Sequence, residues 1–284
     1  MQNLTLDQIA QTAGDLPSLP TIALKVMEMV GDPKASASDM QRVISSDQAL
    51  AARVLKIANS ALFGTRSEIT TISHAVVVLG FSTIRSVVMT SSIQRVYAEG
   101  TRRAGSLSEA SLWEHSLAVA IAAREVARWT DALPQEEAFV SGLLHDIGKL
   151  VLNKNQPNAY AEVLSEVYRG DISFVDAENR MLGFNHAHLG AIVVRKWKLP
   201  ASVVNSILYH HNPGMAPADV PACALTSLAN EMIVTAGIGL EKRVEGDWAE
   251  FEAVKLLSMK ADTVHEIKEK SCALFAAEKD SLMS

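Results

Sequence analysis

The sequence contains few of the features that mark secreted, disulfide-bonded or membrane proteins. Only two cysteines occur among its 284 residues, Cys223 and Cys272, and neither belongs to a C-x-x-C pair. This usage is typical of a reducing compartment and provides no disulfide framework. The N-terminal stretch lacks a basic region followed by an apolar run, so we expect no secretory signal. No uninterrupted apolar run approaches the roughly 18 residues of a membrane span, so we expect no membrane association.

A strong excess of positive charge is also absent. The formal net charge is −6. Basic stretches such as Arg102-Arg103 are short, and we expect them to lie in solvent-exposed loops. We therefore expect no nucleic-acid partner. Hydrophobic residues make up 48% of the chain and charged residues 20%, which is enough for a substantial core. The composition predicts a cytoplasmic protein of one large domain or two smaller ones.

Nearly every periodic segment predicts a helix, because apolar residues recur at spacings of three and four. Ser36 with Asp39 predicts a capping box, and Ser46 or Asp47 is expected to cap the following helix. Residues 72–79 are mostly apolar, and 76–79 alone would suit a strand, but their helical surroundings favour a buried helix that Gly80 ends. Further helices are expected near 20–31, 83–97, 109–129, 135–152, 157–169, 173–181, 186–198, 201–211, 219–236, 248–258 and 262–278.

A polar, glycine-containing link at 98–108 divides the chain. We therefore predict an all-α protein with an N-terminal helical subdomain, residues 1–105, and a helical bundle, residues 106–284. The C-terminal stretch 248–284 is amphipathic, and we expect it to pack on the bundle rather than to form a dimer.

Histidines are concentrated in one part of the chain: six of the eight fall between residues 115 and 211. Core packing gives no reason for this, whereas metal and phosphate sites do. His115 shares an apolar helix face with Leu112 and Val119, where it is either a core residue or a ligand. His145 and Asp146 flank a buried face and could reach one metal together.

Lys149 lies on the same helix flank as the His-Asp pair, where it would hold a phosphate oxygen or form an ordinary salt bridge. His186 stands near a helix start. His210 and His211 close a helix, where the dipole would also favour imidazolium. His188 is expected at the surface or behind the ligands. The isolated His74 and His265 are expected to be structural or exposed.

Imidazoles with a bridging carboxylate suit a first-row divalent metal such as Fe, Mn, Ni or Zn, one or two per chain. Such a metal lowers the pKa of a bound water toward neutrality. With a lysine nearby, phosphoester hydrolysis is the natural reaction class, and Asp146 and Lys149 are its candidate catalytic residues.

The histidine pattern resembles the HD superfamily of metal-dependent phosphohydrolases, and its HD-GYP branch in particular. The N-terminal half resembles the HDOD domain, an HD-related output domain of bacterial signalling proteins. This resemblance covers about residues 16–235. It rests on Leu16-Pro-Ser-Leu-Pro20, Asp47-x-x-Leu50, Ala58-Asn59-Ser60, Ala75-x-x-x-Leu79-Gly80, His145-Asp146-x-Gly148-Lys149 and Trp197-x-Leu199-Pro200.

The resemblance implies an HD-type bundle with a helical N-terminal extension and two metal positions. Asp146 would belong to both. The first position would use His115, His145 and a late aspartate, for which this chain has the weaker neutral ligand Asn230. The second would use His186, His210 and His211.

Two family features are missing. Ser111 stands where a glutamate would support a third metal, and Asn212-Pro-Gly-Met replaces the Gly-Tyr-Pro element associated with cyclic di-GMP hydrolysis.

Two functions from different classes follow. The first is a bacterial signal-transduction module that engages a protein partner and whose degenerate metal site binds a small phosphate ligand without turnover. The alternative is a metal-dependent phosphohydrolase acting on a nucleotide or another phosphoester. A purely structural role for the histidines is the remaining alternative.

Overall fold

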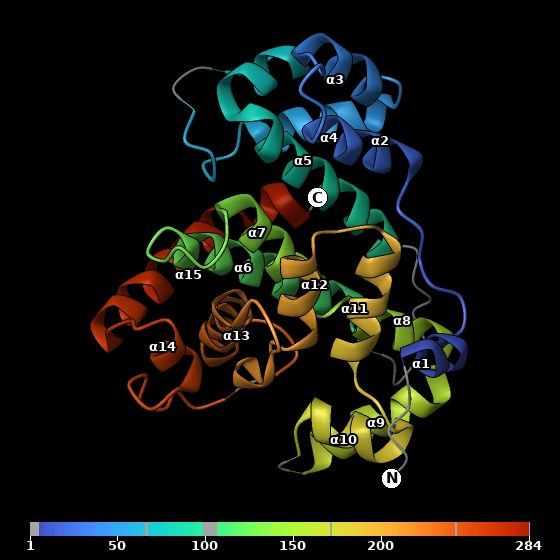
Figure 1. The fold of residues 1–284 in the computed structure, drawn as a ribbon, viewed down its shortest axis with the longest axis vertical. Coiled ribbons are helices and arrows are strands. Elements are labelled where there is room, and N and C mark those ends of the chain that lie inside the picture. The colour runs from blue at the N-terminus through green and yellow to red at the C-terminus, as the bar shows by residue number, and fades with distance from the viewer. Residues whose placement is uncertain (1–5, 66–67, 99–106, 171, 242, 284) are drawn as a thin grey trace. The chain divides into compact units, whose positions relative to one another are not determined.

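The computed structural model describes residues 6–65, 68–98, 107–170, 172–241 and 243–283 (Figure 1). Within these ranges all regular elements are helices, which confirms the all-α prediction. Long apolar stripes rather than alternating patterns explain this, since each helix can bury one face against its neighbours.

The chain divides into two compact units. The first, which we call the histidine unit, comprises Met1–Pro17 and Tyr97–Glu269. The second comprises Ser18–Val96 and Lys270–Ser284. The subdomain boundary expected between residues 105 and 106 lies outside the described residues and stays a prediction.

The second unit is built mainly from helices close together in the sequence. Ser36 forms the expected capping box with Asp39. The next helix is capped by Asp47, whose side chain accepts a hydrogen bond from the amide of Leu50. The helices are α2 Thr21–Val30, α3 Ala37–Ile44, α4 Gln48–Ala58 and the greater part of α5 Ile72–Ala98, joined by the end of α15 Ala261–Met283.

Residues 72–79 form the expected helix, and Gly80 breaks it with φ 83° and ψ 162° before the chain continues as the rest of α5. The expectation of a buried helix holds for one face only. Ala75 and Val76 are buried, but Val77 is 77% exposed and Val78 is 48% exposed, because the helix has only one covered face.

One helix of the described residues, Ile72–Tyr97, is long and apolar enough to cross a membrane by length and composition. Half of its most apolar stretch is buried inside the structure, as in the core helix of a globular protein.

The histidine unit contains the remaining helices. Its core is formed by α6, α7 and α13, and most residues of α6 and α13 are buried. The N-terminal α1 was not among the expected helices. The elements are α1 Leu6–Ala13, α6 Glu109–Ala127, α7 Gln135–Leu144, α8 Ile147–Asn155, α9 Pro157–Arg169, α10 Phe174–Leu182, α11 His186–Lys196, α12 Ala201–Leu208, the 3₁₀ turn η1 Pro213–Met215, α13 Val220–Thr235 and α14 Glu252–Leu256, with the first part of α15.

Two helices end earlier than the periodicity predicts, and both changes concern histidines. The single helix expected over 135–152 is interrupted at His145 and Asp146, which lie between α7 and α8. The helix expected to reach residue 211 ends at Leu208, so His210 and His211 follow it in a turn. Apolar spacing continues across these breaks, and for that reason the sequence pattern does not reveal them.

Gly148 allows the start of α8 to approach the start of α11 backbone to backbone. A Cβ atom at this position would lie 2.0 Å from the carbonyl oxygen of His186 and 2.8 Å from its carbonyl carbon. Only glycine leaves room for this approach. The close contact brings the chain around Asp146 and Lys149 next to His186.

We predict that Gly148→Ala destabilises the protein by about 1–3 kcal/mol or more, because α8 and α11 must separate to admit the methyl group. Chemical denaturation followed by circular dichroism measures the effect. Gly246→Ala is the matched control, since a Cβ there meets no atom within 4 Å. Equal stability of the two variants would contradict the close helix contact.

Candidate metal centre

The structure brings the eight candidate residues together inside the histidine unit, although they come from five separate places in the sequence. Asp146 is at the middle of the group and is 1% exposed. The other members surround it on α6, α8, α11 and α13, between α7 and α8, and in the turn after α12; they are His115, His145, Lys149, His186, His210, His211 and Asn230.

The Asp146 carboxylate lies between two histidine groups. Its Oδ2 faces the first group, at 3.4 Å from His145 Nε2 and 3.9 Å from His115 Nε2. Its Oδ1 faces the second group, at 3.2 Å from His186 Nε2. This is the arrangement that a carboxylate bridging two cations requires.

The first group consists of His115, His145 and Asp146, whose possible ligand atoms lie within 4.8 Å of one another. His145 Nδ1 is 2.7 Å from the carbonyl oxygen of Gly142, one turn earlier in α7. His115 Nε2 is 3.0 Å from the amide oxygen of Asn230 on α13. Asn230 therefore stands beside His115, as the resemblance implies.

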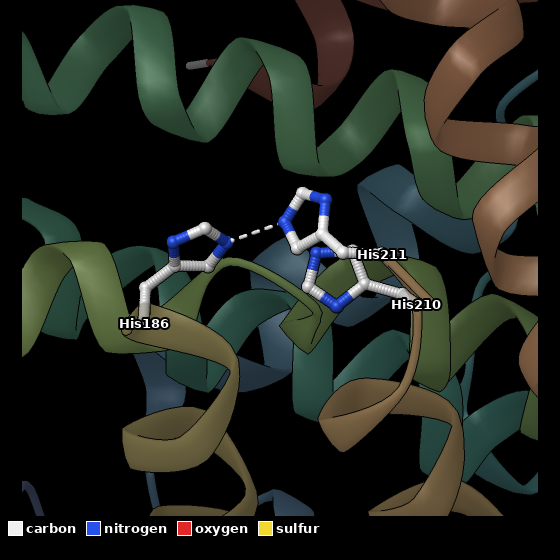
Figure 2. A group of neighbouring side chains, drawn as sticks. All are labelled: His186, His210 and His211. Carbon is white, nitrogen blue, oxygen red and sulfur yellow. Dashed lines mark hydrogen bonds between the residues drawn. The ribbon is translucent and has the colours of Figure 1, made fainter. Parts of the chain in front are cut away.

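The second group consists of His186, His210 and His211, again with ligand atoms within 4.8 Å (Figure 2). The Nε2 atoms of His186 and His211 are 2.9 Å apart. Two ligands at right angles, each about 2.0–2.1 Å from one metal, are separated by about 2.9 Å. The two nitrogen atoms form a hydrogen bond at this distance (Figure 2), which is also close to the spacing of neighbouring ligands on one metal ion.

Partners of the Nδ1 atoms direct the Nε2 atoms inward. The Glu178 carboxylate on α10 accepts hydrogen bonds from the backbone N–H of His186 at 2.8 Å and from its Nδ1 at 2.6 Å. Its other oxygen accepts one from the Tyr160 hydroxyl at 3.0 Å. His210 Nδ1 is 2.7 Å from the carbonyl oxygen of Ile207. A proton on Nδ1 leaves Nε2 as the nitrogen with a free electron pair.

The electrostatics keep most of the imidazoles neutral, which is the state that a metal ligand needs. Burial and the neighbouring imidazoles hold the pKa of His210 and His211 well below the ordinary range. Burial and His145 lower the pKa of His115 to about 4. His186 differs: burial opposes its charged form, but Glu178 and Asp146 outweigh this and raise its pKa to about 9.

Lys149 provides a buried positive charge beside the carboxylate. Its Nζ donates to Asp146 Oδ2 at 2.9 Å and lies 4.5 Å from the centre of the Phe174 ring. Burial would raise the pKa of Asp146, but His145, Lys149 and His186 hold it well below its usual value. The centre thus contains an ionised carboxylate with a lysine within hydrogen-bonding distance.

Three buried polar atoms of the centre have no hydrogen-bond partner among the described residues. They are Asp146 Oδ1, His145 Nε2 and His210 Nε2. Such atoms are rare in folded proteins because each costs about 1–3 kcal/mol. All three are atoms of the kind that bind metal ions, and they belong to the two histidine groups and the carboxylate between them. The residues present therefore fit a divalent metal ion chemically.

The three histidines that we did not expect to bind a metal lie outside the two histidine groups. His188 Nδ1 is 2.9 Å from Asn185 Oδ1 and completes the start of α11. His265 lies beside Glu245 and is half-exposed. His74 belongs to the second unit, on α5.

Sequence reasoning missed the residues that support the ligands. Glu178 is completely buried and holds His186, and Tyr160 holds Glu178. One signal was available: Glu178 occupies the same face of its helix as the apolar Phe174 and Ala177, where a carboxylate is unexpected. Glu241, whose carboxylate is 3.8 Å from Lys149 Nζ, has no comparable signal because it lies outside any helix.

Comparison with known proteins gives one family. A model described as the HDOD domain matches residues 16–213. The crystal structure of an HDOD domain protein of unknown function from Geobacter sulfurreducens is 26% identical, with a TM-score of 0.85 over 98% of this chain and 96% of that chain. A protein from Shewanella amazonensis SB2B, provisionally named as a phosphohydrolase, is also 26% identical, with a TM-score of 0.78 over 97% and 98%.

An uncharacterized protein of Treponema pallidum (strain Nichols) is 28% identical over 227 residues. The match covers 79% of this chain but only 43% of the relative, so the chain spans only about half the length of that protein.

We predict that Tyr160→Phe lowers the free energy of unfolding by about 1–3 kcal/mol, because it leaves the buried Glu178 carboxylate without one of its donors. Thermal and urea unfolding measure this change. Tyr168→Phe is the matched control on the same helix, since Tyr168 is 62% exposed. A Tyr160→Phe variant as stable as the control would mean that the hydroxyl does not support Glu178.

Proposed function

Because the chain belongs to the HDOD domain family, we propose that it is a regulatory signalling module whose histidine centre holds a divalent metal ion and binds a phosphate-bearing ligand without turning it over. Its output, on this proposal, is an interaction with a protein partner in a signalling pathway. The family assignment supports a signalling role.

The observation that carries this proposal is the set of unpartnered inward atoms in a closed centre. Asp146 Oδ1 and His210 Nε2 are buried and make no hydrogen bond. Of the residues that would do chemistry, Asp146 is 1% exposed and Lys149 4%. The burial of these two side chains favours binding of an ion between the imidazoles over turnover of a phosphodiester.

The two histidine groups are not equivalent as metal positions. In the first group, Asp146 Oδ2 already accepts the Lys149 hydrogen bond, and Asn230 offers only a neutral oxygen. In the second, Asp146 Oδ1 makes no hydrogen bond, lies 3.2 Å from His186 Nε2, and three imidazoles converge. We therefore assign the stronger position to His186, His210 and His211 with Asp146.

When bound there, a divalent ion would act as a Lewis acid on a phosphate oxygen. The residues of the chain then have separate tasks. Glu178 orients His186 through its Nδ1, and Lys149 supplies a positive charge for a phosphate oxygen. Fe, Mn, Ni and Zn are the metals that this donor set suits.

The alternative, a metal-dependent phosphohydrolase, is favoured by one observation: the pair of Asp146 and Lys149 stands next to both histidine groups. The name of the Shewanella relative is in line with it. Under this alternative, both residues would contact the reacting phosphoryl group.

We predict that protein purified without chelator contains close to one divalent transition metal per chain, measured by emission spectroscopy. His210→Ala should lose most of it, since a metal site deprived of one ligand binds far more weakly. The control His265→Ala changes a half-exposed histidine outside the centre and should keep the metal.

The same samples separate the two functions through turnover of bis-(p-nitrophenyl) phosphate. Metal without turnover supports the module. Turnover that His145→Ala abolishes supports the phosphohydrolase. Absence of any transition metal in the wild-type protein would eliminate both metal-based proposals.

We predict that Asn230→Asp raises the metal content toward two per chain, because a carboxylate replaces the neutral oxygen next to His115 in the first group. Metal analysis after dialysis against dilute Zn²⁺ or Mn²⁺ measures it. Asn158→Asp adds the same charge at an exposed position on α9 and should have no effect. Identical metal contents in the two variants would show that the first group does not hold a cation.

A further inference from the structure

The chain that follows α13 lies directly on the histidine centre. We call the segment Gly237–Glu241 the strap. The carbonyl oxygen of Ile238 is 3.0 Å from His115 Nδ1. A Cβ atom at Gly239 would lie 2.7 Å from His115 Cβ, and φ at this glycine is +111°. Glycine is therefore required for the strap to rest its backbone on the His115 ring.

The strap ends at a carboxylate placed between two positive charges. Glu241 Oε1 is 3.8 Å from Lys149 Nζ, and Oε2 accepts a hydrogen bond from Arg243 at 2.9 Å. Arg243 also donates to Glu231 on α13 at 2.8 Å. Burial would raise the pKa of Glu241, but Lys149 and Arg243 outweigh it and lower the pKa, so this carboxylate is ionised.

The position of Glu241 has the chemistry of an oxyanion site. Lys149 and Arg243 supply a buried point charge and a planar donor group, the two kinds of group that bind phosphate oxygens in proteins. Lys149 also contacts Asp146, which faces both histidine groups. An anion held by this lysine would therefore lie next to the metal position.

We propose that Glu241 is an internal anion occupying the phosphate position of the centre, and that a phosphate-bearing ligand binds by displacing Glu241 and unseating the strap. This inference deepens the function proposed above and rests on it for the class of ligand. The ligand must be anionic, because it has to replace a carboxylate between two cations.

Displacement would carry the binding event away from the centre. Once Glu241 leaves Lys149, the strap loses this contact and keeps the hydrogen bond between His115 and Ile238 and the bonds from the Gly237 and Ile238 amides to α13. Arg243 would then pair with Glu231 and with the bound anion instead of Glu241. Replacement of Glu241 by another anion at Lys149 thus changes the conformation of the chain that follows α13.

The test measures binding of inorganic phosphate to the full chain by isothermal titration calorimetry. Glu241→Gln keeps the size of the side chain and removes its charge, and Glu241→Ala removes both. We expect phosphate to bind at least tenfold more tightly to both variants than to the wild-type protein, because the competing carboxylate is gone. Glu245→Gln is the matched control: Glu245 follows the strap but pairs with Lys268, and its loss should leave the affinity unchanged.

A second measurement follows the strap itself by hydrogen–deuterium exchange. Phosphate should accelerate amide exchange in residues 237–241 of the wild-type protein, and Glu241→Gln should show the fast exchange without phosphate. Gly239→Ala should also unseat the strap and tighten phosphate binding, although it leaves the Glu241 charge intact. Adding Lys149→Met to Glu241→Gln should abolish the gain in affinity.

Phosphate affinity unchanged or weakened in Glu241→Gln, or exchange in the strap that does not respond to phosphate, would overturn the displacement. Metal content measured on the same samples distinguishes a failure of the Glu241 proposal from a failure of the proposed metal module. Wild-type protein without metal refutes the proposed metal module, whereas metal-replete protein with no gain in phosphate affinity refutes only the role of Glu241.

Discussion

The buried charge of Asp146 is the constraint from which the rest of the centre follows. An ionised carboxylate that is almost entirely excluded from water costs several kcal/mol unless cations and donors surround it. Lys149 provides part of that compensation, and His186, whose pKa Glu178 and Asp146 raise, lies 3.2 Å from the other carboxylate oxygen. His186 in turn is held by Glu178, a second buried carboxylate, which needs the hydroxyl of Tyr160. The buried Asp146 thus needs His186 as a partner, His186 needs Glu178, and Glu178 needs Tyr160.

These contacts do not provide hydrogen bonds for every polar atom of the centre. One oxygen of Asp146 and the inward nitrogens of His145 and His210 remain without hydrogen bonds among the described residues. Purely structural histidines would be expected to pair with their neighbours, since an unpaired buried nitrogen is costly. The atoms left unpaired are those that bind metals, and they surround the bridging carboxylate. A structural role alone therefore gives a poorer account of the centre than a role in binding a cation.

Sequence reasoning predicted the helical fold, the capping box at Ser36 and the grouping of distant histidines, because helix periodicity and residue chemistry are local properties. It did not predict that the chain breaks at His145 and Asp146, since apolar spacing runs through the break. Nor did it find Glu178 or Glu241. The place of Glu178 on an apolar helix face is a local signal, but the partners of both residues depend on which helix ends and turns meet in three dimensions, and no spacing in the sequence records that.

A centre closed by its own glutamate has a consequence for affinity. A ligand that binds only when the strap is displaced has its apparent affinity reduced by the fraction of open molecules, so a strap open about 1% of the time weakens binding about 100-fold. For an enzyme this is a loss at every turnover. For a signalling module it sets the concentration at which the response begins. The contacts of Glu241 with Lys149 and Arg243 would therefore fix the threshold of the response as well as its chemistry.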